Sequence, residues 1–247
     1  MRTLNVVTTS VATLLCVGAA LGCKVSACPD AQPIDGGKST TKENCLQFEA
    51  TEQFTGNART VTQPWSSGKN VTVTSGNGFL KIFSDSTGEV RVEGIPFTRD
   101  THDQANNAYA RLASRPDPAI SADASGNVTV NSPYNGFDGY QLTVHLPSAF
   151  DGVLKASTGA GDVEFSGTLA TSDNSLQTGA GDVTATLGAA SILKATGRTG
   201  LGIVVFRGAW MSPTVAADQQ SGSAQLGAGT GSLDSKTDVG DITFTVQ

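Results

Sequence analysis

The sequence is poor in the residues on which many active sites and large aromatic cores depend. Aromatic residues make up 6% of its 247 residues, and it has two histidines and four cysteines. It contains no basic run and carries a net charge of −6, which disfavours nucleic-acid binding. Neither His102 nor His145 belongs to a nucleophile or zinc motif. The sequence therefore predicts no catalytic residue, no metal site and no cofactor.

Long apolar runs are also scarce, and the one that occurs lies near the N-terminus. Arg2 precedes the uncharged segment 6–21, which is short for a membrane span. This segment leads into Ala20-Leu21-Gly22-Cys23, which resembles the lipobox of bacterial lipoproteins, whose cysteine is acylated. We therefore expect residues 1–22 to be a lipoprotein signal peptide and Cys23 to carry lipid. Simple secretion and a retained N-terminal helix are the alternatives.

The remaining cysteines agree with export. If Cys16 leaves with the signal and Cys23 is acylated, Cys28 and Cys45 form an even remainder, which in an oxidising compartment predicts a disulfide. Such a link would close a 17-residue loop and contribute about 3 kcal/mol in the chain-entropy model. A metal pair is the alternative, but no histidine or third cysteine lies nearby. Residues 23–45 are otherwise polar and suited to a flexible tether.

Glycine is abundant, at 29 residues, and much of it belongs to a recurring six-residue phrase. Thr-Gly-Ala-Gly-Asp-Val occupies 158–163 and 178–183, and related phrases occupy 199–204 and 237–242. The starts are offset by 20, 21 and 38 residues, so the last gap should hold a weaker copy, with Gly222 as the candidate. A period near 20 predicts a solenoid, in which each repeat buries its apolar face against its neighbours.

Two positions of the phrase have a structural explanation. The second glycine is expected at a tight corner that needs a positive φ, and the β-branched residue two places later is expected to face inward. Stacked about 4.8 Å apart, the inward residues would form one column, and the threonines that open the phrases a second. The structural repeat positions are Gly161, Gly181, Gly202 and Gly240, followed by Val163, Val183, Val204 and Ile242.

The aspartates of the phrase allow two interpretations. Asp162 and Asp182 should lie on adjacent repeats, with Ile203 interrupting the ladder, and the two carboxylates could share a cation as in Ca²⁺-binding β-rolls. Those rolls, however, repeat Gly-Gly-x-Gly-x-Asp every nine residues. The longer period here favours turn capping by exposed carboxylates.

Outside the phrases the chain alternates with period two, which predicts strands. Residues 75–80 are a diverged early copy of the phrase. One segment departs from this pattern: apolar residues recur at helical spacing over about 101–114, where Asp100 or Thr101 could cap a helix that covers an open end of the sheet. The predicted fold is an all-β, single-domain β-solenoid (β-helix) over 46–247, with roughly 20-residue repeats and one short capping helix.

A family resemblance follows from these segments. From Phe54 to Gln247 the chain resembles the bacterial putative-adhesin family of β-strand repeats, which implies a β-helical solenoid and supplies no catalytic or binding residue. The segments that carry the resemblance are Val71-Thr72-Val73 leading to Gly78, Gly88 to Val92, Leu142 to Pro147, and Leu154 to Ser157 leading to Gly161-Asp162-Val163.

The functional expectation is a membrane-anchored bacterial envelope lipoprotein, at the outer membrane or cell surface. It would present a non-catalytic β-solenoid for adhesion or scaffolding, with glycan or extracellular matrix as partner and no nucleic acid. The alternative is a carbohydrate-active β-helix enzyme, a lyase or hydrolase, which would need clustered acids with a Lys or Arg and aromatic platforms. Phe165 and Phe244 have the inward parity of core residues, which leaves Trp210 as the aromatic residue to consider for the surface.

Overall fold

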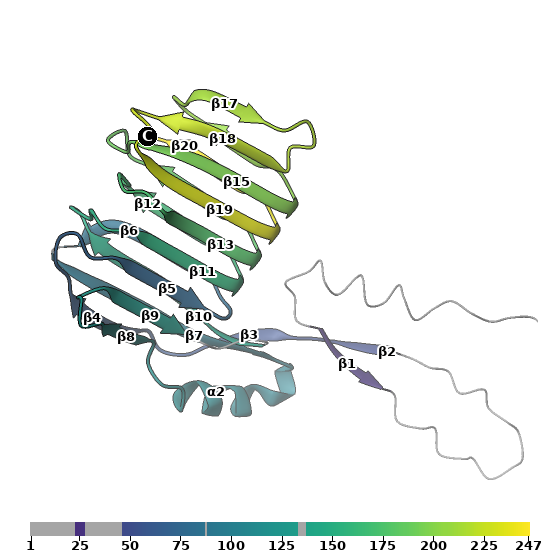
Figure 1. Ribbon diagram of the computed structural model, residues 1–247. Helices are drawn as coiled ribbons and strands as arrows, with labels where there is room; N and C mark the ends of the chain where they lie inside the picture. The colour runs from purple at the N-terminus through teal and green to yellow at the C-terminus, as the bar shows by residue number, and fades with distance from the viewer. Residues whose placement is uncertain (1–22, 28–45, 87, 133–136) are drawn as a thin grey trace, which may run out of the picture.

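Two β-sheets lie face to face, with their strands stacked along a common axis (Figure 1). The computed structural model describes residues 23–27, 46–86, 88–132 and 137–247. The front sheet, nearest the viewer in Figure 1, runs in the order β17 (Met211–Val215), β18 (Ser221–Leu226), β15 (Leu193–Leu201), β19 (Gly231–Val239), β13 (Asn174–Ala180), β11 (Leu154–Ala160), β5 (Val71–Ser75), β9 (Val128–Ser132) and β8 (Ala119–Ala122).

The back sheet contains the other half of each repeat. Its order is β16 (Val204–Arg207), β20 (Ile242–Val246), β14 (Val183–Leu187), β12 (Val163–Gly167), β6 (Leu80–Ser86), β10 (Asp138–Pro147), β7 (Glu89–Asp100) and β3 (Glu52–Thr55), and β4 (Arg59–Pro64) also pairs with β7. We call a front strand, its glycine corner and the following back strand a rung. The fold is thus all-β, as predicted, with stacked strands.

The rungs do not stack in chain order. β13 pairs in parallel with β19, and β19 pairs in parallel with β15, so the rung formed by residues 231–246 lies between those at 174–187 and 193–207. The inward column therefore runs Val163, Val183, Ile242, Val204, rather than in sequence order. The order of the copies in the stack thus differs from their order in the chain.

The prediction of a weaker copy of the phrase at Gly222 is wrong. Gly222 lies in β18, which pairs antiparallel with β15 and places Gly222 opposite Gly197. β17 then pairs antiparallel with β18, so residues 211–226 add two antiparallel strands to the front sheet. The 38-residue offset therefore arises because β17 and β18 are inserted between two copies of the phrase, and not because a weaker copy forms a further rung. The early copy at 75–80, in contrast, does form a corner, between β5 and β6, which pair in parallel with β11 and β12.

The core lies between the sheets and combines small and large side chains within each rung. Two places after the inward Val/Ile column of the back sheet, Phe165, Ala185, Phe244 and Phe206 are register partners. In the front sheet the residues two places before the corner threonines are Ala156, Leu176, Ser235 and Gly197. Each rung thus carries one small and one large residue at these positions. Phe165 and Phe244 are buried, as predicted, and Phe244 stacks on Phe206 at 5.0 Å between ring centroids.

A helix and a buried arginine occupy the other end of the stack. α2 (Ala105–Ala113) follows a 3₁₀ turn at His102–Gln104 and packs Ala108 and Leu112 against Phe54 of β3, close to the predicted span. Neither Asp100 nor Thr101 caps the helix through its side chain; the 3₁₀ turn takes the place of a cap. Just after the helix, Arg115 is buried and donates to the carbonyls of Phe97 and Gly139.

The N-terminal segment shows one further difference from expectation. β1 (Cys23–Ala27) pairs antiparallel with β2 (Leu46–Ala50), from Cys23 opposite Ala50 to Ala27 opposite Leu46. The first five residues of the segment expected to be a flexible tether therefore form a strand. The predicted signal peptide, residues 1–22, lies outside the described residues, as do Cys28 and Cys45.

Candidate binding surface

The repeated corners are held by hydrogen bonds between rungs. The threonine that opens each phrase donates its hydroxyl to the carbonyl of the corner glycine on the neighbouring rung: Thr158 to Gly78, Thr178 to Gly161, Thr237 to Gly181 and Thr199 to Gly240, at 2.7–3.1 Å between oxygens. These hydroxyls point into the stack and are buried with it. The threonine column is thus a structural device and leaves no hydroxyl there for a ligand.

The corner glycines meet two requirements at once. Gly161, Gly181, Gly202 and Gly240 have φ between +121° and +148°, a region that L-residues rarely adopt. A Cβ at Gly181 would also lie 2.4 Å from the carbonyl oxygen of Gly161. Both the backbone conformation and the close approach of the next rung therefore require glycine.

The aspartates form a ladder of their own along this edge. Asp162 Oδ1 accepts from the amide of Asp182 at 2.9 Å, and Asp182 Oδ1 accepts from the amide of Asp241 at 2.8 Å. Asp241 Oδ1 in turn accepts from the amide of Ile203 at 2.9 Å. Ile203 therefore ends the ladder, because the rung order places Asp241 before it. One oxygen of each carboxylate is engaged by a backbone amide, which is turn capping between rungs.

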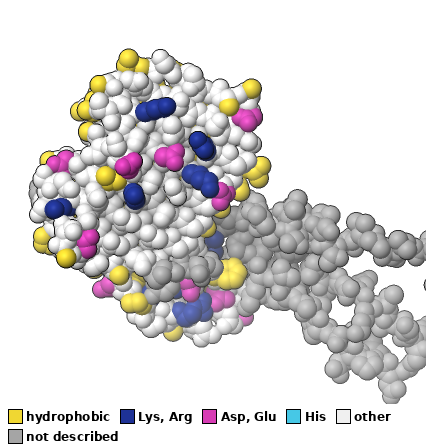
Figure 2. All heavy atoms as spheres, in the orientation of Figure 1, with side chains coloured by type: hydrophobic (Ala, Val, Ile, Leu, Met, Phe, Trp, Pro, Cys, Tyr) yellow, Lys and Arg dark blue, Asp and Glu magenta, His cyan; other side chains and the backbone are white. Residues whose placement is uncertain are grey.

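The outward side of the front sheet is broad and polar (Figure 2). Figure 2 shows separated Lys/Arg and Asp/Glu side chains on a mostly uncharged face, with hydrophobic side chains mainly near its margins. In the central front strands, alternate residues point outward while their neighbours are buried, as in the burial patterns of β11, β13, β15 and β19. The outward positions across four central strands are Lys155, Ser157, Ser175, Gln177, Asp234, Lys236, Lys194, Thr196 and Arg198.

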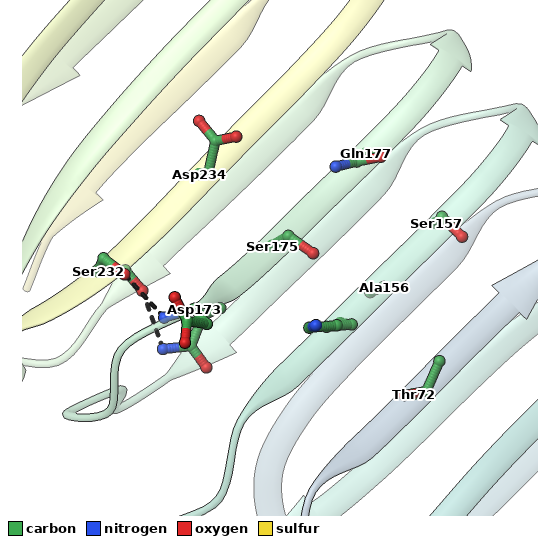
Figure 3. A pocket seen from close by; sticks show the side chains of 10 residues that line it. Thr72, Ala156, Ser157, Asp173, Ser175, Gln177, Ser232 and Asp234 are labelled. Carbon is green, nitrogen blue, oxygen red and sulfur yellow. Dashed lines mark hydrogen bonds between the residues drawn. The ribbon is translucent and has the colours of Figure 1, made fainter.

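One hollow in this face, which we call the lower groove, has a volume of about 490 Å³ (Figure 3). It is lined by Thr72, Lys155, Ala156, Ser157, Asp173, Asn174, Ser175, Gln177, Ser232 and Asp234. Ser232 fixes one margin, since its hydroxyl accepts from the amide of Asp173 at 2.7 Å and its carbonyl accepts from the Asn174 amide group at 3.0 Å. Two carboxylates and one lysine thus share a shallow site with no aromatic side chain in its lining.

A second hollow, the upper groove, has a volume of about 630 Å³ and lies where β17 and β18 meet β15. It is lined by Lys194, Thr196, Gly197, Arg198, Thr214, Val215, Ala216, Ser221, Gly222 and Ser223. Thr214 Oγ1 contacts Ser223 Oγ at 3.2 Å across the pair β17–β18, which orders one wall. No acidic residue belongs to this lining, in contrast to the lower groove.

Comparison with known proteins identifies the family of this chain. A family model described as Toastrack DUF4097 matches residues 120–247. The chain belongs to the Toastrack DUF4097 family. The matched residues contain both grooves except for Thr72, and four of the five glycine corners. This agrees with the resemblance to a putative-adhesin family of β-strand repeats.

Two solved structures match this Toastrack chain in a comparison of structures. A putative cell adhesion protein from Clostridium sporogenes is 13% identical and has a TM-score of 0.50, with 77% of this chain and all of that chain covered. A putative adhesin from Bacteroides fragilis is 10% identical with a TM-score of 0.21, over 76% of this chain and 97% of that one. At such identity the first shows a shared fold. No curated protein matches the chain.

The two histidines of the Toastrack chain lie far from both grooves. His145, in β10, is buried on the back sheet, with Nδ1 2.8 Å from Asp85 Oδ1 and Nε2 3.9 Å from Glu93 Oε1. His102 is exposed beside Glu52. Within the described ranges, no group of three His, Cys, Asp or Glu residues could hold a metal ion. In those same ranges no helix has the length and apolarity to cross a membrane.

Two carboxylates support the loops at the lower margin of the Toastrack face. The Ser67 hydroxyl and the amide of Gly68 donate to Asp151, at 2.5 and 2.6 Å, and these bonds lower the pKa of Asp151. The Asn127 side chain and amide, with the amides of Ser125 and Gly126, likewise lower the pKa of Asp123. Both carboxylates therefore stay ionised and order their turns.

Sequence reasoning assigned a binding role to none of the residues that line the two grooves. Lys155, Asp173, Lys194, Arg198 and Asp234 occupy ordinary outward or turn positions, and none of them belongs to the six-residue phrase. Their period-two alternation could have assigned them to one face of a sheet. Their grouping depends on the rung order, which places β19 between β13 and β15.

Proposed function

We propose that this chain is a bacterial envelope lipoprotein that presents the outward side of the front sheet for non-catalytic adhesion or scaffolding. The observation that carries the proposal is the polar face itself: two shallow grooves on a stack whose corners are fixed by hydrogen bonds between rungs. A rigid face of this kind offers many weak polar contacts and suits multivalent attachment better than a single deep pocket would. Glycan or matrix polymers are the partners that fit such a face.

The family and the fold neighbour support this proposal. The Clostridium sporogenes protein, whose whole length is covered, is described as a putative cell adhesion protein. The described residues also contain few features that an enzyme would need, since the hydroxyls of the threonine column and one oxygen of each ladder aspartate are engaged by the backbone. We therefore propose a non-enzymatic role.

Anchoring through Cys23 is part of the proposal. The chain enters the folded body at β3, on the outer edge of the back sheet, whereas β16 and β17 end the two sheets at the opposite end. A lipid at Cys23 would therefore leave the β15–β18 end farthest along the stack from the point of attachment. The test is to express the full chain in a bacterium with a labelled fatty-acid analogue: Cys23→Ala should lose both the label and the membrane association. Equal labelling of both forms would refute the anchor.

A disulfide between Cys28 and Cys45, which lie outside the described residues, is also part of the proposal. It is supported by the even number of cysteines that remain once Cys16 leaves with the signal and Cys23 is acylated, in an oxidising compartment. Non-reducing peptide mass spectrometry after periplasmic expression should find the linked peptides, and free thiols at both positions would refute the link.

The adhesive role has a direct test. Purified full chain is incubated with envelope polysaccharides and with matrix extracts, and both retention of the protein and release of shortened glycans are measured. Retention without product release supports adhesion or scaffolding. Retention by neither material would refute it.

A carbohydrate-active enzyme is the second candidate, and the lower groove favours it by one observation. Asp173, Asp234 and Lys155 line the same hollow, so two carboxylates and a base share one site. All three are exposed, and the Thr196 hydroxyl already donates to Asp234 at 2.7 Å. Release of shortened glycans that disappears in both Asp173→Asn and Asp234→Asn, but persists in Asp238→Asn, would establish the enzyme and displace the adhesive proposal.

A further inference from the structure

The upper groove differs from the rest of the polar face in its charge. Lys194 and Arg198 both line it, and among the described residues neither has an ion-pair partner. In the lower groove, by contrast, Lys155 shares the lining with Asp173 and Asp234. Two cations on other strands are paired, since Lys236 lies 3.3 Å from Asp238 and Lys81 lies 3.3 Å from Glu164. A chain with a net charge of −6 therefore keeps two uncompensated positive charges in one hollow.

The spacing of these cations suits an extended ligand. Lys194 and Arg198 are four residues apart on β15, so both point outward and their Cα atoms lie about 13 Å apart at 3.3 Å per residue. Thr196 lies between them, and hydroxyls of Thr214, Ser221 and Ser223 come from β17 and β18. The carboxylate of Asp234 on β19 accepts the Thr196 hydroxyl and lies outside the groove lining.

We infer that the upper groove binds a carboxylated or sulfated polysaccharide. Two anionic groups along such a polymer would lie on Lys194 and Arg198, where the Arg guanidinium can take a carboxylate or sulfate in a bidentate manner. The groove hydroxyls would bond the sugar hydroxyls between them. No aromatic residue lines the groove, so nucleic-acid bases would find no stacking surface, and a polysaccharide is the better match.

This inference rests on the proposed adhesive function and names its ligand class. The groove is built from β15, β17 and β18, at the end of the stack opposite β3, where the chain enters the body. A molecule anchored through its N-terminal segment would therefore present this groove at its far end. Contact with a surrounding polymer would be made there first.

The experiment compares two charge-matched double variants of the full chain. Lys194→Ala/Arg198→Ala removes the groove cations, and Lys69→Ala/Arg207→Ala removes one lysine and one arginine that line neither groove. Binding to immobilised polygalacturonate and dextran sulfate is measured against neutral dextran, at low and high salt. The groove variant should bind either polyanion at least about tenfold more weakly, because two charge-assisted contacts are lost. The control should stay within about twofold, and Arg198→Lys should fall between, since a point charge replaces a bidentate one.

The outcomes separate this inference from the proposed function. Equal weakening by both double variants would assign binding to general charge and overturn the groove site. Equal binding to neutral dextran would overturn the anionic ligand class, while retention on glycan would still support adhesion. Failure of the full chain to bind any glycan or envelope material would refute both. Circular dichroism melts of each variant exclude loss of fold as the cause.

Discussion

The strands at the two ends of the molecule are joined by different kinds of contact. In the stack from β11 to β20, each rung is attached to the next by a repeated set of short hydrogen bonds, from a threonine hydroxyl, an aspartate carboxylate and corner amides. At the β3–β10 end, one buried cation joins several elements: Arg115 donates to Phe97 and Gly139 and pairs with Asp138 at 2.9 Å. Repetition spreads the stabilisation over many equal contacts, whereas the arginine concentrates it.

The largest effect is expected from Arg115→Met. The substitution leaves the Asp138 carboxylate and two carbonyls without their buried partner, which typically costs about 3–5 kcal/mol. Arg111→Met is the matched control, because Arg111 pairs with Asp100 near the surface with its side chain 43% exposed, and it should cost less than about 1 kcal/mol. Urea unfolding of both variants measures the difference. Similar losses would show that the end is not held by one central cation.

Gly181→Ala should have the next largest effect and tests the corner. The φ of +141° and a Cβ placed 2.4 Å from the Gly161 carbonyl oxygen together predict a loss of about 3 kcal/mol. Gly88→Ala has a positive φ of +76° but open space around its Cβ, so it should lose only about 1 kcal/mol. If the two variants unfold at the same urea concentration, rung contact contributes nothing to the glycine requirement.

A smaller loss is expected from one bond of the threonine column. Thr178→Val removes the hydroxyl that donates to Gly161 and should cost about 1 kcal/mol. Thr184→Val changes the same residue type at an outward position of β14 and should stay within about 0.5 kcal/mol. Thermal melts of both proteins provide the comparison. A loss from Thr178→Val as large as that from Arg115→Met would contradict the idea that repetition spreads the stabilisation.

The smallest expected effect is on the pH dependence of stability, below about pH 4. Because the pKa of Asp151 is lowered in the folded state, mainly by the Ser67 hydroxyl, its contribution to stability is present above its ordinary pKa of 3.8 and is lost as the pH falls below that value. Ser67→Ala should raise the pKa of Asp151 and reduce the difference in stability between pH 6 and pH 3, without changing the fold. Unfolding midpoints measured across that range test this. An unchanged pH dependence would exclude Asp151 as a contributor.

The sequence was informative where structure is local. The phrase at 178–183 predicts a corner because a positive φ and an inward valine are decided within six residues, and the helix near 105 is set by its own periodicity. The rung order could not be predicted in this way, because 199–204 and 237–242 carry almost the same local signal. Which neighbours they take depends on strand pairing across the stack, such as β19 with both β13 and β15. The grooves depend on that order, so their residues could not be grouped either.

The inserted rung has a consequence for the order in which the chain is made. Strands β19 and β20 follow β15 to β18 in the sequence, yet they lie between the rungs at 174–187 and 193–207. A solenoid with consecutive rungs could grow from one end as the polypeptide emerges. Here the rung at 193–207 lacks its parallel neighbour until residues 231–246 have been synthesised. Both strand edges that flank the gap stay open until then, so a chain halted before residue 231 would expose two unpaired edges suited to aggregation.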